Sequence, residues 1–304
     1  MTPPTAKDPA YGFMAALGSF ILWGLLPIYW KTVQSVPPLE ILCHRIVWSL
    51  VFIGIILTVK HRWPETFAPL RSKRNIAILV MSSLCIGGNW LLYIWSVNTN
   101  HVLETSLGYY INPLVNVLFG FIFFRERLSP MQCIAIGLAA LGVANSIISY
   151  GELPWISLVL AVTFALYGLL RKIAAVESLP GLFLETMVLA PAALYYLIHL
   201  QASGASPFLA GNLTVNIMLV GAGVVTATPL IGFAFGARRL QLTTLGILQY
   251  AAPSIAFVLG VFVYNEPFGP SHLLTFALIW LGLAVYTGDS IRTIRKQRKA
   301  RKKA

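Results

Sequence analysis

The chain alternates long apolar runs with short polar or charged segments. Each run has roughly 17–25 residues, the length that a helix needs to cross the hydrocarbon core of a bilayer. The ten runs lie near residues 11–30, 39–59, 75–97, 102–124, 129–149, 154–172, 180–199, 214–237, 242–264 and 271–290. This pattern predicts an all-α integral membrane protein with ten transmembrane helices.

Composition agrees with a membrane protein. Of the 304 residues, 57% are hydrophobic and 11% are charged, whereas soluble domains carry about 25% charged residues. The cysteines Cys43, Cys85 and Cys133 lie in apolar runs without a CxxC motif, and we expect them to be reduced core residues. The first run contains Trp23 and Pro27 and lacks a small-residue cleavage site, so we interpret it as a span and not as a signal peptide.

The second half of the chain repeats the first with an offset of 140 residues. The stretch LETSLGYYINPLVNVLFGFIFFRERLSP, residues 103–130, aligns without gaps with TTLGILQYAAPSIAFVLGVFVYNEPFGP, residues 243–270. Identical residues at this offset are Tyr110, Pro113, Gly120, Glu126, Pro130, Leu138, Leu141, Gly142 and Ala144, which match Tyr250, Pro253, Gly260, Glu266, Pro270, Leu278, Leu281, Gly282 and Ala284. We therefore predict a duplicated unit, with repeats at 1–149 and 150–290 and a basic tail at 291–304.

The basic residues indicate orientation. With the N-terminus on side one, all but two of the 22 Lys and Arg fall on that side, and the two others are Lys31 and Arg45. The positive-inside rule then places both termini in the cytoplasm. Five spans per half is an odd number, so the two halves enter the membrane in opposite orientations. Glu126 is expected at the cytoplasmic face and Glu266 at the outer face, which is the arrangement of an inverted repeat.

The net charge of +12 would suggest nucleic acid as the partner of a soluble protein. Here the charge lies in loops and in the tail beside the predicted spans, including the segment KHRWPETFAPLRSKRN. We expect these residues to meet anionic lipid head groups and expect no nucleic-acid partner.

Span 2 carries a charged residue inside an apolar run. Arg45 lies about 10 Å deep at 1.5 Å per residue, where an unpaired arginine costs at least about 2.5–3.5 kcal/mol. It therefore faces protein or a wet cavity: it is either a substrate or gating contact or a structural arginine that bonds helix ends or snorkels outward. His44 beside it is a candidate ligand contact or an interhelical donor.

Span 4 carries a polar stripe. Thr105, Tyr109, Asn112 and Asn116 follow at i, i+4, i+7 and i+11, on one helix face. The side-chain amides of Asn112 and Asn116 either bond a neighbouring helix or line a cavity beside Pro113.

Further candidates come from the other spans. Trp23 and Tyr167 match between spans 1 and 6 and either form an aromatic cavity wall or pack helices at small residues. The remaining candidate substrate contacts are Asn89, Tyr93, Thr228, Gln249 and Tyr250. Glu185 is expected to be hydrated or paired with Arg171 or Lys172.

Several functional classes lack their sequence motifs. No P-loop, HExxH, GxSxG or GxGxxG occurs, and the five histidines have no metal spacing. We predict no catalytic residues, no metal ligands and no cofactor. A carboxylate near mid-membrane is also not found, so the sequence does not support proton coupling.

The segments FILWGLLPIYWK, PPLEILCHRIVWS, SLGYYINPL and FFRERLSP together resemble the EamA-type families of the drug/metabolite transporter superfamily, and more closely its RarD branch. The likeness covers nearly the whole chain. It implies two inverted five-helix repeats around a cavity lined by spans 1, 3, 4, 6, 8 and 9, residence in a bacterial inner membrane, and export or uptake of small metabolites or drugs. Glu185 and Thr186 stand where symmetry would place a second His–Arg pair, so that pair is not duplicated.

We therefore predict a permease that moves a small-molecule substrate by alternating access. Two alternatives stay open. A membrane-embedded enzyme would need a catalytic constellation, and a non-transporting scaffold would not need an inverted repeat or polar amides near mid-membrane. The sequence leaves open the solute, the direction, the coupling ion and the oligomeric state.

Overall fold

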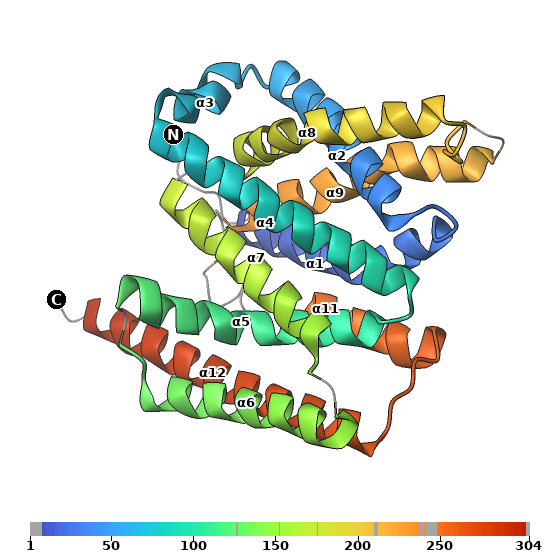
Figure 1. Cartoon of the computed structure of the whole chain (residues 1–304). Helices are drawn as coiled ribbons and strands as arrows, with labels where there is room; N and C mark the ends of the chain where they lie inside the picture. The colour runs from blue at the N-terminus through green and yellow to red at the C-terminus, as the bar shows by residue number, and fades with distance from the viewer. Residues whose placement is uncertain are drawn as a thin grey trace.

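A computed structural model describes residues 8–125, 127–151, 153–174, 176–209, 212–237, 240 and 248–301 (Figure 1). Within these ranges the chain folds into helices joined by short connections. The elements are α1 (Asp8–Thr32), α2 (Pro38–Val59), α3 (Trp63–Phe67), η1 (Ala68–Arg71), α4 (Lys73–Asn98), α5 (Val102–Phe124), α6 (Pro130–Tyr150), α7 (Trp155–Ala174), α8 (Ser178–Ala202), α9 (Leu213–Ala237), α11 (Ala251–Val258), η2 (Leu259–Val263) and α12 (Pro270–Arg301).

Eight of the described helices are long and apolar enough to cross a membrane, and they coincide with eight of the ten predicted spans. The sixth and ninth predicted spans correspond to shorter apolar helices, Trp155–Arg171 and Ala251–Val263. The first part of the ninth predicted span, residues 242–247, lies outside the described residues. The structure therefore supports an all-helical, multi-pass protein, and the number ten stays a prediction.

The local sequence explains where helices begin and end. The Ser129 side chain accepts a hydrogen bond from the backbone N–H of Gln132, whose side chain accepts one from the Ser129 N–H. This capping box, followed by Pro130 at the first helical position, fixes the start of α6. At its other end, Gly151 takes a left-handed φ of 70°, which glycine adopts without a steric penalty.

Helices from the two sequence halves pack on each other. In the lower part of Figure 1, α5, α6, α11 and α12 lie together, and α2, α3, α8 and α9 form the upper part. Between them, α1 packs on α9 and on α11, and α7 packs on α4 and on α5. The sequence repeat relates α1 to α7, α4 to α9 and α5 to α11. The contacts of α1 with α9 and α11 therefore correspond to the contacts of α7 with α4 and α5. Neither half is separate from the other.

The contact between α6 and α12 is reciprocal. A Cβ on Gly142 of α6 would lie 3.1 Å from the carbonyl oxygen of Thr275 in α12, and a Cβ on Gly282 of α12 would lie 2.8 Å from the carbonyl oxygen of Ala135 in α6. Gly282 follows Gly142 by 140 positions, and Thr275 follows Ala135 by the same number. Each helix thus presents the same two positions to the other, as in a two-fold symmetric contact.

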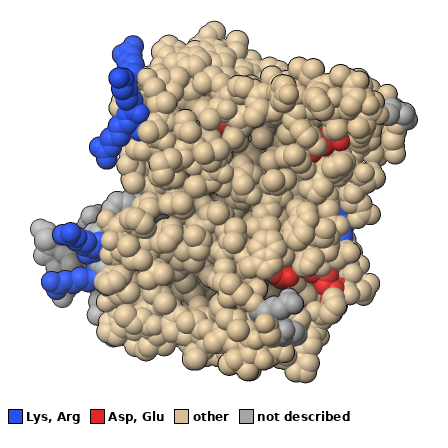
Figure 2. Space-filling view, viewed as in Figure 1, with Lys and Arg blue, Asp and Glu red and all other residues tan. Residues whose placement is uncertain are grey.

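Basic residues gather at one end of the molecule. Most of the visible Lys and Arg lie at the left of Figure 2, the end at which α12 finishes in Figure 1, whereas most of the visible Asp and Glu lie in the right half of this face as small patches in a largely uncharged surface. Arg71, at the end of η1, and Lys73 and Arg74, at the start of α4, are exposed. This distribution is the one expected of a protein whose central belt meets lipid tails.

The three cysteines are free. Cys43 is buried, as predicted, but Cys85 is only partly buried and Cys133 is exposed, so the prediction of a core position is wrong for Cys133. Lipid tails solvate apolar side chains, and an apolar run in a membrane helix therefore does not identify its buried face.

Candidate functional site

Arg45 is the centre of a buried aromatic cluster. The residue is 5% exposed. Its guanidinium carbon lies 4.0 Å from the ring centroid of Trp90 in α4 and 5.3 Å from that of Trp30 in α1. Both contacts are cation–π contacts, which stabilise a desolvated cation by about 2 kcal/mol or more.

Two nitrogens of this guanidinium lack hydrogen-bond partners. Nε and Nη1 are buried and donate no hydrogen bond to any residue that the structure describes. Within the same ranges, no carboxylate oxygen lies within 4.0 Å of it. Glu40, on the same helix, accepts a hydrogen bond of 2.6 Å from Ser206 instead. Buried charges in proteins are normally paired and hydrogen-bonded, so these two nitrogens are an unusual feature of the molecule.

Two tyrosines stand beside Arg45. The side chains of Tyr93 in α4 and Tyr109 in α5 interact electrostatically with the guanidinium. Their ring centroids are 5.8 Å apart, and the Tyr109 ring lies 6.0 Å from that of Phe164 in α7. Neither hydroxyl forms a hydrogen bond with a described residue. The cluster therefore combines one cation, two free hydroxyl groups and several aromatic faces.

The predicted amides lie against α7. Asn89 of α4 donates to the Leu160 carbonyl at 3.0 Å and to the Thr163 hydroxyl at 2.9 Å. Asn112 of α5 donates to the Ala161 carbonyl at 3.0 Å and accepts from Asn116 at 3.0 Å. The bond to a neighbouring helix, one of the two alternatives for Asn112, is therefore present. Asn116 itself is exposed.

The structure thus places Arg45 of α2 beside Tyr93 and Tyr109, and Asn89 and Asn112 on successive carbonyls of α7. The other predicted contacts lie elsewhere. The His44 ring lies 4.4 Å from the Phe208 ring at an interplanar angle of 52°, and His44 accepts a 3.3 Å hydrogen bond from Trp48. Trp23 packs against Phe20 and Phe233, Thr228 is exposed, Gln249 is half-buried, and Tyr250 lies against Tyr110.

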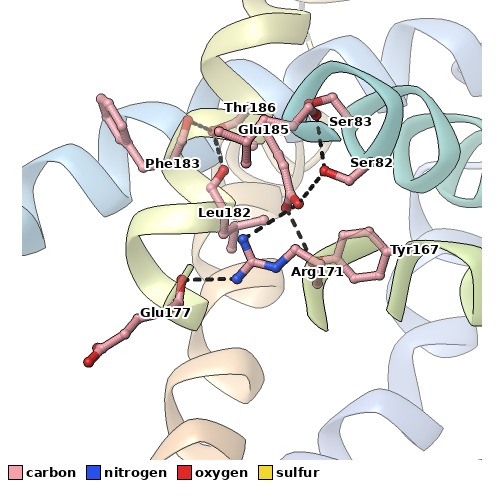
Figure 3. Close-up of polar contacts among 10 residues, drawn as sticks. Ser82, Ser83, Tyr167, Arg171, Glu177, Leu182, Phe183, Glu185 and Thr186 are labelled. Carbon is pink, nitrogen blue, oxygen red and sulfur yellow. Dashed lines mark hydrogen bonds and ion pairs between the residues drawn. The ribbon is translucent and has the colours of Figure 1, made fainter. Parts of the chain in front are cut away.

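Tyr167 belongs to a second buried polar cluster (Figure 3). Glu185 of α8 is fully buried and accepts hydrogen bonds from Ser82 of α4 at 2.9 Å and from Tyr167 of α7 at 3.1 Å. Arg171 lies 3.6 Å from the same carboxylate and donates at 2.9 Å to the Glu177 carbonyl. Of the alternatives for Glu185, the structure shows the pairing with Arg171, and α4, α7 and α8 contribute the groups around the buried carboxylate.

Contacts between the halves occur at both ends of the molecule. At one end, the Glu266 carboxylate accepts hydrogen bonds from the backbone N–H groups of Val102 and Leu103, at 2.6 and 2.7 Å. There Lys31 also donates to Asn100 and lies 5.1 Å from the Tyr264 ring centroid. Glu126, the repeat counterpart of Glu266, lies outside the described residues.

At the opposite end, Arg62, in the connection after α2, forms an ion pair of 2.8 Å with Glu177, before α8. Its hydrogen bonds to Glu177 and Glu65 raise the pKa of Arg62 above its ordinary value. Different polar contacts therefore connect the helices at the two ends of the molecule: Glu266 with the start of α5 at one end, and Arg62 with Glu177 at the other.

Sequence reasoning missed Trp30 and Trp90 as neighbours of Arg45, and Phe164 as a neighbour of Tyr109. Only the unpaired charge on Arg45 signalled a need for partners. The aromatic residues come from three different helices, and no spacing rule within one helix connects them.

Comparison with known proteins gives consistent results. The EamA-like transporter family matches residues 10–148. An uncharacterized transporter of Vibrio cholerae is 43% identical over 98% of this chain and 99% of its own length. The protein RarD of Escherichia coli is 42% identical over 97% of this chain and 99% of its own length.

A more distant relative, the chloramphenicol-sensitive protein RarD of Pseudomonas aeruginosa, is 31% identical over 94% of this chain and 96% of its own length. One crystal structure shares the fold, with a TM-score of 0.58 and 21% identity over 90% of this chain and 96% of that chain.

Proposed function

Because the chain belongs to the RarD branch of the EamA-like transporter family, we propose that it is a secondary transporter that moves small organic solutes across the bacterial inner membrane by alternating access. The family and the names of the relatives point to a membrane transporter rather than to an enzyme. The proposal adds the mechanism, the membrane and the location of the site.

The reciprocal contact of α6 and α12 carries this proposal. Gly142 meets Thr275 as Gly282 meets Ala135, and the same offset relates both pairs. An inverted repeat gives such a contact when its two halves are related by an axis in the membrane plane. In that arrangement, exchanging the conformations of the two halves converts a state closed at one end into a state closed at the other.

The Arg45 cluster lies where such an exchange would expose a solute to either side. Arg45 comes from the first half, and α7, which carries Phe164 and the carbonyls that Asn89 and Asn112 bind, comes from the second half. Motion of one half against the other would therefore change the walls of this cluster. In our proposal, Glu266 and Lys31 close the outer end, Arg62 and Glu177 lie at the cytoplasmic end, and the basic loops and tail contact anionic lipids.

Flux measurements on the full chain in proteoliposomes test the proposal. A panel of amino acids, nucleosides and amphenicols is supplied as labelled solutes, the amphenicols because one relative is named for chloramphenicol sensitivity. We expect saturable uptake of at least one solute, accelerated by the same unlabelled solute on the opposite side. Such counterflow requires a site that faces one side at a time. Movement without counterflow would indicate a channel, and no movement of any solute would contradict the proposal.

A further inference from the structure

We propose that the Arg45 guanidinium binds the carboxylate of a small organic monoacid whose apolar or aromatic body lies against the neighbouring rings. This inference rests on the proposed transport function and names the substrate class of its site. The observation behind it is a buried cation with two nitrogens that lack hydrogen-bond partners.

The Arg45 guanidinium combines ring contacts with unpaired N–H donors. The rings of Trp90 and Trp30 pack on Arg45 at 4.0 and 5.3 Å from its guanidinium carbon. The N–H donors of a guanidinium lie in its plane and form a fork that matches a carboxylate. Two of its nitrogens, Nε and Nη1, are buried and have no hydrogen-bond partner among the described residues; each belongs to one of the two edges that the guanidinium forms with Nη2.

A purely structural role does not account for these unpaired nitrogens. Arg171, whose side chain is 13% exposed, also has a nitrogen without a hydrogen bond, Nη1, but the Glu185 carboxylate lies 3.6 Å from that nitrogen, and Nη2 donates at 2.9 Å to the Glu177 carbonyl. Ring contacts stabilise the charge of Arg45 but accept none of its edge N–H donors. An unpaired buried charge destabilises a protein. A ligand carboxylate would supply the hydrogen-bond acceptors that the described residues do not offer to Arg45.

The surroundings favour a carboxylate with an apolar body. Among the described side chains, Arg45 is the only cation with contacts inside this cluster, and one guanidinium neutralises one carboxylate, whereas a phosphate dianion carries a second charge. The hydroxyl groups of Tyr93 and Tyr109 are free to donate to a bound oxygen. The rings of Tyr109 and Phe164, 6.0 Å apart, provide apolar faces for the rest of the molecule.

Binding measurements with matched acids and amides test the inference. Benzoate, phenylacetate and indole-3-acetate are titrated into the detergent-purified full chain by calorimetry, each beside its primary amide, with phenyl phosphate as the competing oxyanion. We expect at least one acid to bind, and to bind at least tenfold more tightly than its amide, because the amide lacks the charge and the second acceptor oxygen. We expect phenyl phosphate to bind more weakly than that acid.

Variants locate the site. Arg45→Met is expected to abolish the preference for the acid, and Arg45→Lys is expected to weaken acid binding at least tenfold because lysine cannot form the planar two-bond contact. Arg71→Met, which removes an exposed cation, is the matched control and should bind as the wild type does. If Arg45→Met does not fold, Tyr109→Phe replaces it, with an expected loss of acid affinity of about threefold to tenfold for one hydrogen bond.

The inference is overturned if no acid binds, if acids and amides bind equally, if phenyl phosphate binds most tightly, or if the folded Arg45 variants keep the acid preference. Flux in proteoliposomes separates this inference from the proposed function. Transport of solutes without an acid preference would overturn the inference and leave the transporter standing. Acid binding at Arg45 without flux of any bound acid would support the binding site and contradict the proposed transport function.

Discussion

The ring of Tyr110 stacks on the ring of Tyr250, with centroids 6.3 Å apart and an interplanar angle of 24°. The two residues are separated by 140 positions and occupy the same place in the two sequence repeats. A residue that contacts its own counterpart lies close to a symmetry axis. This pair therefore agrees with the reciprocal contact of α6 and α12, because both are what a two-fold relationship between the halves would produce.

Substitution of the paired glycines tests this symmetry. Gly142→Val and Gly282→Val would each place side-chain atoms against a carbonyl of the partner helix, and we expect each to destabilise the protein by about 1–3 kcal/mol through overpacking. Gly137→Val in α6 is the matched control, since a Cβ there meets nothing within 4 Å. Unfolding in detergent by SDS titration measures the three variants. A control as unstable as the other two would contradict the packing argument.

Membrane topology follows from the proposed inverted repeat. Reporter fusions after Ser149 and after Ala304 should report the outside and the inside, respectively. A further fusion after Glu177 should report the inside, because the apolar helix Trp155–Arg171 crosses between it and Ser149. If both fusions report the same compartment, this helix does not cross the membrane. The two halves would then not each have five spans, and the argument for an inverted repeat would fail.

Glu266 stabilises the end of the molecule at which α5 begins. Its carboxylate accepts hydrogen bonds from the Val102 and Leu103 N–H groups and is 7% exposed. Glutamine offers one acceptor oxygen and turns an NH2 group toward the other donor. We expect Glu266→Gln to lower the free energy of unfolding by about 1–3 kcal/mol. Glu65→Gln, which removes an exposed ion pair, is the control and should change it by less than about 1 kcal/mol.

Glu185 should contribute mainly to stability through its ion pair. Glu185→Gln leaves the Arg171 guanidinium, whose side chain is 13% exposed, without its counter-ion. We expect a loss of about 3 kcal/mol, the lower part of the range for breaking a buried pair. Tyr167→Phe removes a single hydrogen bond from the same carboxylate and should cost about 1 kcal/mol. Equal effects of the two variants in SDS titration would show that the charge on Glu185 does not matter.

Asn112 connects α5 with the second half of the chain. Asn112→Leu removes the hydrogen bond to the Ala161 carbonyl and leaves Asn116 without its acceptor. We expect the initial rate of uptake, normalised to inserted protein, to fall more for Asn112→Leu than for Leu118→Ala, because Leu118 makes no polar contact and is 37% exposed. A larger fall for Leu118→Ala would show that this face of α5 does not belong to the path.

The sequence by itself determined the helices and their internal relationship. Apolar runs predicted eight of the long helices because a bilayer sets their length. The ends of α6 are also set locally, by Ser129, Pro130 and Gly151, because caps depend on neighbouring residues alone. The repeat was visible in Tyr110 and Tyr250 without any coordinates.

Only the tertiary structure decided which side chains meet. Arg45 and Glu185 lie 140 positions apart, and each is the seventh residue after the first of its helix, Pro38 in α2 and Ser178 in α8. Nevertheless Glu185 is enclosed by three partners, whereas Arg45 meets two indole rings and keeps two nitrogens without a hydrogen-bond partner among the described residues. The sequence could not decide this, because lipid-facing and protein-facing positions are both apolar in a membrane helix. The rotation of each helix about its axis, and with it the neighbours of every polar side chain, depends on packing between distant segments.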